Sequence, residues 1–397
     1  MPLNFTSKEV SILLKLIKGI EVYSPKYLGI KDVLIVGDKI GKIDDEVDIL
    51  GVEVEIIDGK GKRLLPGFID SHVHITGGGG EGGFKTRTPE IVLSDVIKGG
   101  ITTIVGTLGT DGITRSLENL YAKAKALEEE GITTFIYTGS YRVPPVTFTG
   151  SIMKDLILID KVVGVGEIAL SDHRSSQPTI EELKRLVADA RVSGILSGKA
   201  GVVNIHMGDG KEGLDMLMEI VDTTEIPITQ FYPTHVNRNP YLFRQGIEFA
   251  KMGGFIDFTT SSDPVFYEEG EVKASKALKK CIEDDLEDNV TLTSDGQGSL
   301  PKFNEKRELV GLQVGRVTTL FKEVRDAVFD GVPLEKAIKA ITVNPAKILK
   351  LSSKGYIKEG YDADMVLIDG EYNIDTVIAK GRIMMKDKKI LTYGTFE

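Results

Sequence analysis

Short runs of hydrophobic and β-branched residues alternate with longer amphipathic stretches through the middle of the chain. This alternation is typical of parallel βα units, in which each strand is followed by a helix that covers the sheet. Eight such units predict an α/β fold, a TIM-like (β/α)8 barrel. The expected strands span residues 67–70, 102–106, 133–137, 162–168, 202–205, 226–231, 255–258 and 290–293.

Amphipathic stretches with helical periodicity lie between or after these strands. The expected helices span residues 180–193, 213–221, 274–286 and 309–329, and a last helix pair ends near residues 346–349. They would form the outer layer of the barrel.

The two ends of the chain have a different pattern. Up to about Leu65, and again after about Lys354, the sequence consists of short strands and turns, including a hairpin over residues 32–41. Termini of domains often lie close together. We therefore expect residues 1–65 and 354–397 to form one small, discontinuous β-sandwich domain, and residues 66–353 to form the barrel.

Composition narrows the function classes. The net charge of −10 argues against nucleic acid as a partner, because phosphates need a basic surface. No stretch is apolar for long enough to cross a membrane. The one cysteine, Cys281, lies in a helix-like segment and is expected to be a buried structural thiol. A single cysteine fits a reducing compartment, so we expect a cytoplasmic protein.

Chemically capable side chains follow the predicted strands. In a barrel these strand ends converge on one rim, where the active sites of this fold lie. Four of the five histidines of the chain come immediately after a predicted strand, and His173 is the exception. In chain order the rim residues are His72, His74, Thr110, Asp111, Ser140, Tyr141, Glu167, Asp172, His173, Arg174, His206, His235, Arg238 and Asp295.

The first of these groups indicates a metal site. His72 and His74 are two positions apart at a strand end, so both imidazoles point to the same face and can bind one ion. Four imidazoles with Glu167 and Asp295 exceed the three protein ligands of a typical catalytic zinc, which favours two zinc ions. A hydroxide between them would be a strong nucleophile at neutral pH. Asp295 fits the general base that takes its proton and passes it to a leaving amine.

Each of these residues alone is a weak signal. A single histidine after a strand is more often structural, Asp-Gly is common in turns, and a rim arginine more often forms a surface ion pair. It is their convergence on one rim that favours the site. For the fifth histidine, His173, a structural role and a supporting role beside the metal stay equally open.

A glycine-rich segment, residues 77–83, follows the first strand. It lacks the Lys-Ser/Thr ending of a phosphate-binding loop. A lid, or a close approach of the backbone to a ligand, is the better interpretation. Glu81 is its one charged residue and suits an ammonium group.

Several motifs together resemble the amidohydrolase superfamily, and within it the isoaspartyl dipeptidases, over nearly the full length. The more specific ones are the tetraglycine segment with Glu81 and the Ser-Asp-His-Arg segment at residues 171–174. The full set is Pro-Gly-Phe-Ile-Asp at 66–70 with His72 and His74, the loop at 77–81 with residues 86–90, and residues 138–141, 171–175, 233–239 and 294–296.

The resemblance implies a role for each site residue. His72 and His74 would bind one metal with Asp295, and His206 and His235 would bind the second. Around them, Glu81 would hold a substrate α-amino group, Arg174, Arg238 and Ser299 would take carboxylates, Tyr141 would polarise the scissile carbonyl or stabilise the oxyanion, and Gly79 and Thr110 would line the pocket.

Such a pocket suits β-aspartyl dipeptides, which carry one ammonium and at least two carboxylates. The implied reaction is metal-dependent hydrolysis of the isoaspartyl amide bond, releasing aspartate and an amino acid, and the family also implies a homo-oligomer. Alternatives are a cyclic amidase of the dihydroorotase or hydantoinase kind, an N-acyl-amino-acid deacylase, and a catalytically silent relative.

One position departs from the pattern of the isoaspartyl dipeptidases. They carry a carboxylated lysine that bridges the metals four residues before the Ser of Ser-Asp-His-Arg, whereas this chain has Glu167 there. Other amidohydrolases bridge with a glutamate, but its side chain is shorter, so either the strand or the metals shift or one metal alone binds tightly. Lys161 cannot replace it, because six residues of strand place it roughly 20 Å away.

Overall fold

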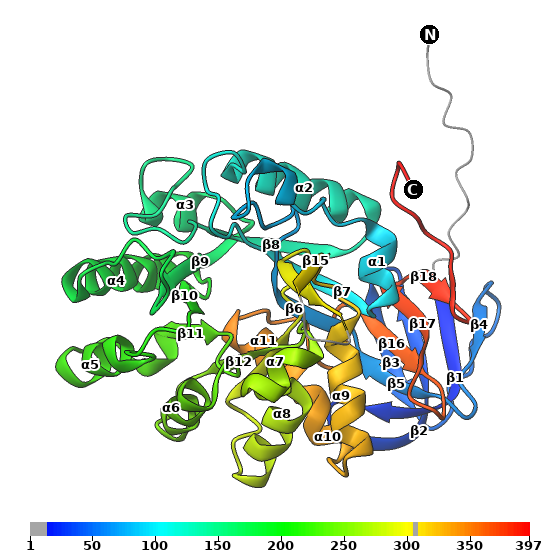
Figure 1. The fold of residues 1–397 in the computed structure, drawn as a ribbon. Helices are drawn as coiled ribbons and strands as arrows, with labels where there is room; N and C mark the ends of the chain where they lie inside the picture. Colours follow the sequence, from blue (N-terminus) through cyan, green and yellow to red (C-terminus); the bar gives the residue numbers. More distant parts are fainter. Residues whose placement is uncertain (1–13, 305–308) are drawn as a thin grey trace.

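The computed structural model describes residues 14–304 and 309–397 (Figure 1). The first 13 residues, which the sequence analysis assigned to the small β domain, lie outside the described residues. The strands of the two chain ends lie together on one side of the molecule, and the strands and helices of the middle of the chain lie on the other.

The middle of the chain forms a TIM-like arrangement of parallel strands. Six strands form one sheet in the order β11-β10-β9-β8-β7-β6, and β12 pairs in parallel with β13. Contacts of β12 with β11 and of β13 with β6 link the pair to both edges of that sheet. The strands are β6 (Phe68–Val73), β7 (Ile101–Gly106), β8 (Thr133–Thr138), β9 (Val162–Leu170), β10 (Val202–Met207), β11 (Phe231–Thr234), β12 (Ile256–Thr259) and β13 (Val290–Thr293).

These strands are hydrophobic in continuous runs because both of their faces are covered. Phe68 and Ile104 pack with the surrounding helices in the largest core cluster. The next residues, Ile69 and Val105, join Tyr137 in a separate cluster on the other face of the sheet. The alternation of side chains along a strand thus divides the core into two layers.

Eleven α-helices occur in the described residues, and the expected ones at 180–193, 213–221 and 274–286 are present with shifted ends. Helix α4 starts at a capping box between Thr179 and Glu182 and ends at Gly198, which has a φ of 71°. Cys281 is buried in α8, as expected, and burial raises the pKa of its thiol to about 12. The helices are α1 (Leu93–Lys98), α2 (Leu117–Glu130), α3 (Ile152–Leu158), α4 (Ile180–Ser197), α5 (Asp215–Thr223), α6 (Pro240–Lys251), α7 (Pro264–Glu269), α8 (Ala274–Glu283), α9 (Thr319–Phe329), α10 (Leu334–Ala337) and α11 (Val343–Ile348).

Two predicted elements were wrong in part. The expected helix over 309–329 begins only at Thr319, and its first part is the strand β15 (Leu309–Val314), which pairs antiparallel with β14 (Ser299–Phe303). Glycines at 311 and 315 weaken a helix there, and the Gly315 N–H donates to the Gly298 carbonyl. The expected strand at 226–231 begins only at Phe231, because a 3-10 turn, η2 (Ile228–Gln230), follows Pro227.

The two ends of the chain meet in one mixed nine-stranded sheet, in the order β19-β18-β17-β16-β5-β1-β2-β3 with β4 beside β1. The antiparallel pair β5–β16 joins them, with Pro66 opposite Met365. Its strands are β1 (Leu14–Tyr23), β2 (Tyr27–Val36), β3 (Lys39–Asp44), β4 (Glu55–Asp58), β5 (Arg63–Pro66), β16 (Met365–Ile368), β17 (Ile374–Ala379), β18 (Arg382–Lys386) and β19 (Lys389–Ile390). The β2–β3 hairpin confirms the one expected at 32–41, whereas a sandwich of two sheets stays a prediction.

Within the described residues, none of the helices combines the length and the apolar character that crossing a bilayer requires.

The loop between β8 and α3 depends on one buried carboxylate, Asp155. It accepts hydrogen bonds from Thr138 Oγ1 (2.6 Å), the Phe148 N–H (2.8 Å), and the N–H and Oγ1 of Thr149 (3.0 and 2.7 Å). Replacing Asp155 with Ala leaves these donors without their acceptor. We expect the free energy of unfolding in urea to fall by about 3 kcal/mol.

Asp160→Ala is the matched control, because Asp160 lies in the same region and is exposed. It is expected to change the free energy of unfolding by less than about 0.5 kcal/mol. Equal losses in the two variants would contradict the proposed importance of the Asp155 hydrogen bonds.

Candidate active site

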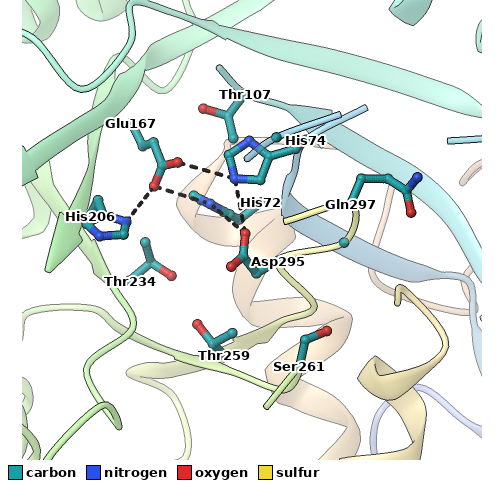
Figure 2. A network of polar contacts seen from close by, with 12 residues as sticks. His72, His74, Thr107, Glu167, His206, Thr234, Thr259, Ser261, Asp295 and Gln297 are labelled. Carbon is teal, nitrogen blue, oxygen red and sulfur yellow. Dashed lines mark hydrogen bonds and ion pairs between the residues drawn. The ribbon is translucent and has the colours of Figure 1, made fainter. Parts of the chain in front are cut away.

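Four histidines and two carboxylates converge at the carboxyl ends of the barrel strands, and Figure 2 shows His72, His74, His206, Glu167 and Asp295 among them. His72 lies in β6 and His74 directly follows it, while Glu167 and His206 come from β9 and β10. His235 and Asp295 follow β11 and β13, respectively. All six expected metal-binding residues are therefore brought to one rim.

Glu167 lies at the centre of this group and is fully buried. Its Oε2 is 3.4 Å from His72 Nε2, 3.1 Å from His206 Nδ1 and 3.8 Å from His235 Nε2. Its Oε1 is 3.4 Å from His74 Nε2. The glutamate therefore reaches all four imidazoles, although its side chain is shorter than a carboxylated lysine.

Asp295 approaches the group from the opposite side in Figure 2. Its Oδ1 is 3.1 Å from His74 Nε2 and 3.6 Å from His72 Nε2. Two compact sets of potential ligands result, each with its ligand atoms within 4.8 Å of one another: His72, His74 and Asp295, and His72, Glu167 and His235.

His206 belongs to neither compact set, although its ring centroid lies 4.5 Å from that of His235. The residues of the expected first group thus lie close together, whereas the compact set that includes His235 contains Glu167 and not His206.

Burial and mutual charge shift the pKa values of these groups. Burial alone would lower the pKa of His74, but its close contact with Asp295 and the charges of Asp295 and Glu167 raise it to about 9. Burial raises the pKa of Asp295, and the contact with His74 outweighs this and lowers it to about 2. Burial and the neighbouring His206 lower the pKa of His235 to about 3. Burial raises the pKa of the Glu167 carboxyl group, but the surrounding histidines outweigh this and hold that pKa well below its usual value.

Several atoms of this cluster are buried without a hydrogen-bond partner among the described residues. They are His72 Nε2, His74 Nδ1, Glu167 Oε1 and Asp295 Oδ1. Buried polar atoms normally have partners, so such a concentration of orphans needs an explanation. Imidazole nitrogens and carboxylate oxygens are ligands that zinc accepts. The donor set therefore fits metal ions of this kind.

Neighbouring side chains orient the imidazoles. The Nδ1 of His72 lies 3.0 Å from Asn204 Oδ1, and the Asn204 amide donates to the Tyr232 carbonyl at 3.2 Å. Because an amide oxygen only accepts, His72 carries its proton on Nδ1 and leaves Nε2 free to bind a metal. Thr259 Oγ1 contacts His235 Nδ1 and thereby orients that ring too, although a hydroxyl can donate or accept and so does not select a tautomer.

The sequence analysis missed Asn204. It precedes His206 by two residues on β10 and so shares its face, which is the same spacing that identified the His72 and His74 pair.

The residues expected to bind substrate surround this cluster. Glu81 Oε1 accepts from Thr110 Oγ1 at 2.9 Å and lies 3.3 Å from Arg174 Nη1. The Tyr141 hydroxyl is 2.9 Å from His206 Nδ1, and the Arg174 guanidinium lies 5.4 Å from the centre of the Tyr141 ring. Glu81, Arg174 and Tyr141 thus form a continuous polar wall that begins at His206.

A cavity of about 450 Å³ opens beside His235 and Asp295. Arg174, Arg238 and Ser299 line it. The structure therefore places both expected carboxylate-binding arginines on one cavity that reaches the histidine and carboxylate cluster.

Gly79 lies against the protein rather than against open space. Its φ is +69°, and a Cβ there would be 2.7 Å from the Thr86 carbonyl oxygen and 2.9 Å from Ser299 Cβ. The sequence predicted a close approach of this glycine-rich backbone to a ligand, whereas at Gly79 the backbone closely approaches other residues of the protein. This approach brings the backbone at Gly79 beside Ser299 at the cavity.

Two other residues lie away from the cluster. The side chain of His173 is 90% exposed, with Nδ1 3.6 Å from Asp172 Oδ1, so it points to solvent. Lys161 forms an ion pair with Glu128 and donates to the Thr134 carbonyl at 2.9 Å. It is therefore no bridging ligand, as expected.

Comparisons with known proteins agree with this geometry. A crystal structure of the β-aspartyl dipeptidase of Fervidobacterium islandicum AW-1 in complex with the β-Asp-Leu dipeptide is 56% identical, with a TM-score of 0.89 over 95% of this chain and 97% of that one. A second structure of β-aspartyl dipeptidase from that organism is 54% identical, with a TM-score of 0.87 over 95% and 98%. Dihydropyrimidinase from Brevibacillus agri NCHU1002 shares the fold, at 17% identity and a TM-score of 0.66 over 96% and 97%.

The family comparison covers most of the chain. The profile of the amidohydrolase family matches residues 63–384, a range that begins in β5 and ends in β18. It includes all six residues of the histidine and carboxylate cluster. The chain belongs to the amidohydrolase family.

Proposed function

We propose that the protein hydrolyses the β-aspartyl (isoaspartyl) amide bond of dipeptides and releases aspartate and a second amino acid. The observation that carries this proposal is the arrangement of Glu81, Arg174 and Arg238 around one histidine and carboxylate cluster. One anionic and two cationic groups match the single ammonium and the carboxylates of such a dipeptide. The similarity to β-aspartyl dipeptidase at 56% identity supports it.

The cluster would hold two zinc ions. His72, His74 and Asp295 would bind one, His206 and His235 the other, and Glu167 would bridge them. When bound, the ions would supply a hydroxide nucleophile at neutral pH and polarise the amide carbonyl. The orphaned buried atoms of the cluster support this assignment.

Two residues of the chain would act on the reacting groups. Asp295 would act as general base and acid, taking the proton of the attacking nucleophile and delivering it to the leaving amine. Its low pKa, which the contact with His74 causes against the effect of burial, makes it an ionised acceptor at the start of the reaction. The Tyr141 hydroxyl, at the wall beside His206, would donate a hydrogen bond to the carbonyl oxygen.

The substrate would replace contacts that the chain makes with itself. Glu81 would hold the α-ammonium, and Arg174, Arg238 and Ser299 the carboxylates, with Gly79 and Thr110 lining the pocket. Since Glu81 and Arg174 are already paired at 3.3 Å, the arriving ammonium and carboxylate take over both charges together.

The alternatives explain less of the site. A cyclic amidase or an N-acyl-amino-acid deacylase needs the same cluster, but its substrate has no ammonium for Glu81. A catalytically silent relative would have lost ligands, whereas every expected ligand position is filled here. The division into a barrel (66–353) and a small β domain, the cytoplasmic location and the homo-oligomer stay predictions.

Purified protein loaded with zinc is expected to release aspartate and leucine from β-Asp-Leu. Its kcat/KM for α-Asp-Leu is expected to be at least about 100-fold lower, because the α-linked isomer cannot place its ammonium, carboxylates and scissile bond correctly together. Chromatography of the products measures both rates. No release from β-Asp-Leu, with rapid hydrolysis of a dihydropyrimidine or a hydantoin, would show that the proposal is wrong.

Glu81→Gln is expected to lower kcat/KM for β-Asp-Leu about 10-fold, since it removes the charge that faces the ammonium. N-succinyl-leucine is the matched substrate, because it is β-Asp-Leu without the α-amino group. The wild type should hydrolyse it poorly, and the variant should lose much less activity toward it. An equal loss of activity toward both substrates would show that Glu81 does not bind the α-ammonium group.

Glu167→Ala is expected to bind fewer zinc ions than the wild type and to lose activity by at least about 100-fold. Metal analysis after gel filtration and the β-Asp-Leu assay measure the two effects. Because a glutamate needs no carbon dioxide, bicarbonate should not change the activation of the wild type by zinc. Activation by bicarbonate, or full zinc content in Glu167→Ala, would contradict the role of Glu167 as bridge.

A further inference from the structure

Asp172 lies between the histidine and carboxylate cluster and the arginines of the cavity. It is the second residue after β9 and is 6% exposed. Its Oδ1 accepts hydrogen bonds from the Arg174 N–H (2.7 Å) and Nε (3.0 Å), and its Oδ2 accepts from Arg174 Nη2 (2.8 Å). One edge of the Arg174 guanidinium is thus fixed by two parallel bonds, the strong form of this pair.

The same carboxylate contacts His206. Asp172 Oδ2 lies 3.2 Å from His206 Nε2, while the other ring nitrogen, Nδ1, is 3.1 Å from Glu167 Oε2. A neutral imidazole donates from one nitrogen and accepts at the other. If Nε2 donates to Asp172, Nδ1 carries its lone pair on the side of Glu167 Oε2 and of the Tyr141 hydroxyl at 2.9 Å, so the ring is oriented to bind a metal ion from the side of the carboxylates.

The orientation of His72 follows the same rule. There Asn204 accepts from Nδ1 and leaves Nε2 toward the carboxylates. A hydrogen-bonded acceptor behind a metal-binding histidine commonly fixes the tautomer and the ring orientation. Asp172 takes this position behind His206 and, unlike Asn204, also binds an arginine of the cavity.

We propose that Asp172 is a positioning residue that couples the metal centre to the substrate pocket, by orienting His206 toward a metal ion and Arg174 toward a substrate carboxylate. This inference rests on the proposed function for the identity of metal and substrate. It assigns no chemical step to Asp172.

The two arginines of the cavity differ in how much of each guanidinium group is already bound. Asp172 occupies the Nε–Nη2 edge of Arg174, which leaves the Nη1 end for Glu81 or for substrate. Among the residues that the structure describes, Arg238 has no such close partner: Nη1 is 3.9 Å from Asp172 Oδ2 and Nε is 3.9 Å from Asp209 Oδ1. Arg238 therefore keeps its whole fork for a bidentate carboxylate contact, whereas Arg174 offers one end.

The loop around Asp172 does not depend on its carboxylate alone. The Ser175 N–H and Gln177 Nε2 donate to the Asp172 backbone carbonyl, at 3.1 and 2.9 Å. A change of this side chain leaves those bonds in place, so a variant with an altered carboxylate is expected to fold.

The test is Asp172→Asn in the full chain. We expect zinc affinity, measured by competition with a chelator, to fall 10- to 100-fold, as is usual for loss of such a partner. At saturating zinc, KM for β-Asp-Leu is still expected to rise about 10-fold, because Arg174 loses its ionic anchor. Circular dichroism checks folding, and Asp172→Ser replaces Asp172→Asn if the latter fails that check.

Two further variants isolate the effects. His173→Ala changes the adjacent, exposed residue and should alter both zinc affinity and KM less than twofold. Arg174→Ala should raise KM but weaken zinc binding less than Asp172→Asn does, because it removes the substrate contact while Asp172 keeps its own contact with His206.

Wild-type zinc affinity in Asp172→Asn, or a wild-type KM at saturating zinc, overturns the proposal. Failure of the wild type to hydrolyse β-Asp-Leu would instead count against the proposed function. The zinc affinity of Asp172→Asn would still test whether Asp172 orients His206 toward a metal ion.

Discussion

A fully buried carboxylate at the centre of the rim is the constraint on which the site depends. An ionised group in such a place is costly unless charged or hydrogen-bonding partners surround it. Glu167 meets this condition through four imidazoles that arrive from three directions, on β6, on β10 and after β11. The barrel brings these strand ends together. The charge balance of the cluster therefore depends on the fold, because only the fold places the four imidazoles around Glu167.

From this centre, contacts extend outward in order. His206 connects Glu167 to Asp172 and Tyr141, and Asp172 connects to Arg174, whose far end meets Glu81. Each link is a hydrogen bond or an ion pair between two side chains. The geometry of the pocket is thereby tied to that of the cluster, and neither can shift freely without the other.

The sequence predicted the parallel strands and the rim residues well, because hydrophobic runs and strand-end spacing are local signals. It failed at 309–329, where the pairing of β15 with β14 overrides a helical pattern that two glycines already weaken. It also assigned no role to Asn204 and Asp172, since their importance comes from contacts across strands. For Glu167 the residue type is evident from the chain, but the distances that its carboxylate spans depend on how closely the strands approach one another.

Glu81 and Arg174 act as counter-ions to each other. On the proposed function, a ligand that carries only a carboxylate releases Arg174 but leaves Glu81 facing a negative charge, and a ligand that carries only an ammonium leaves the arginine unpaired. A zwitterion supplies an ammonium group for Glu81 and a carboxylate for Arg174, so neither side chain is left without a counter-ion. On that function, charge pairing would select zwitterions independently of the bond to be cleaved, and simple acids and simple amines would make poor competitors.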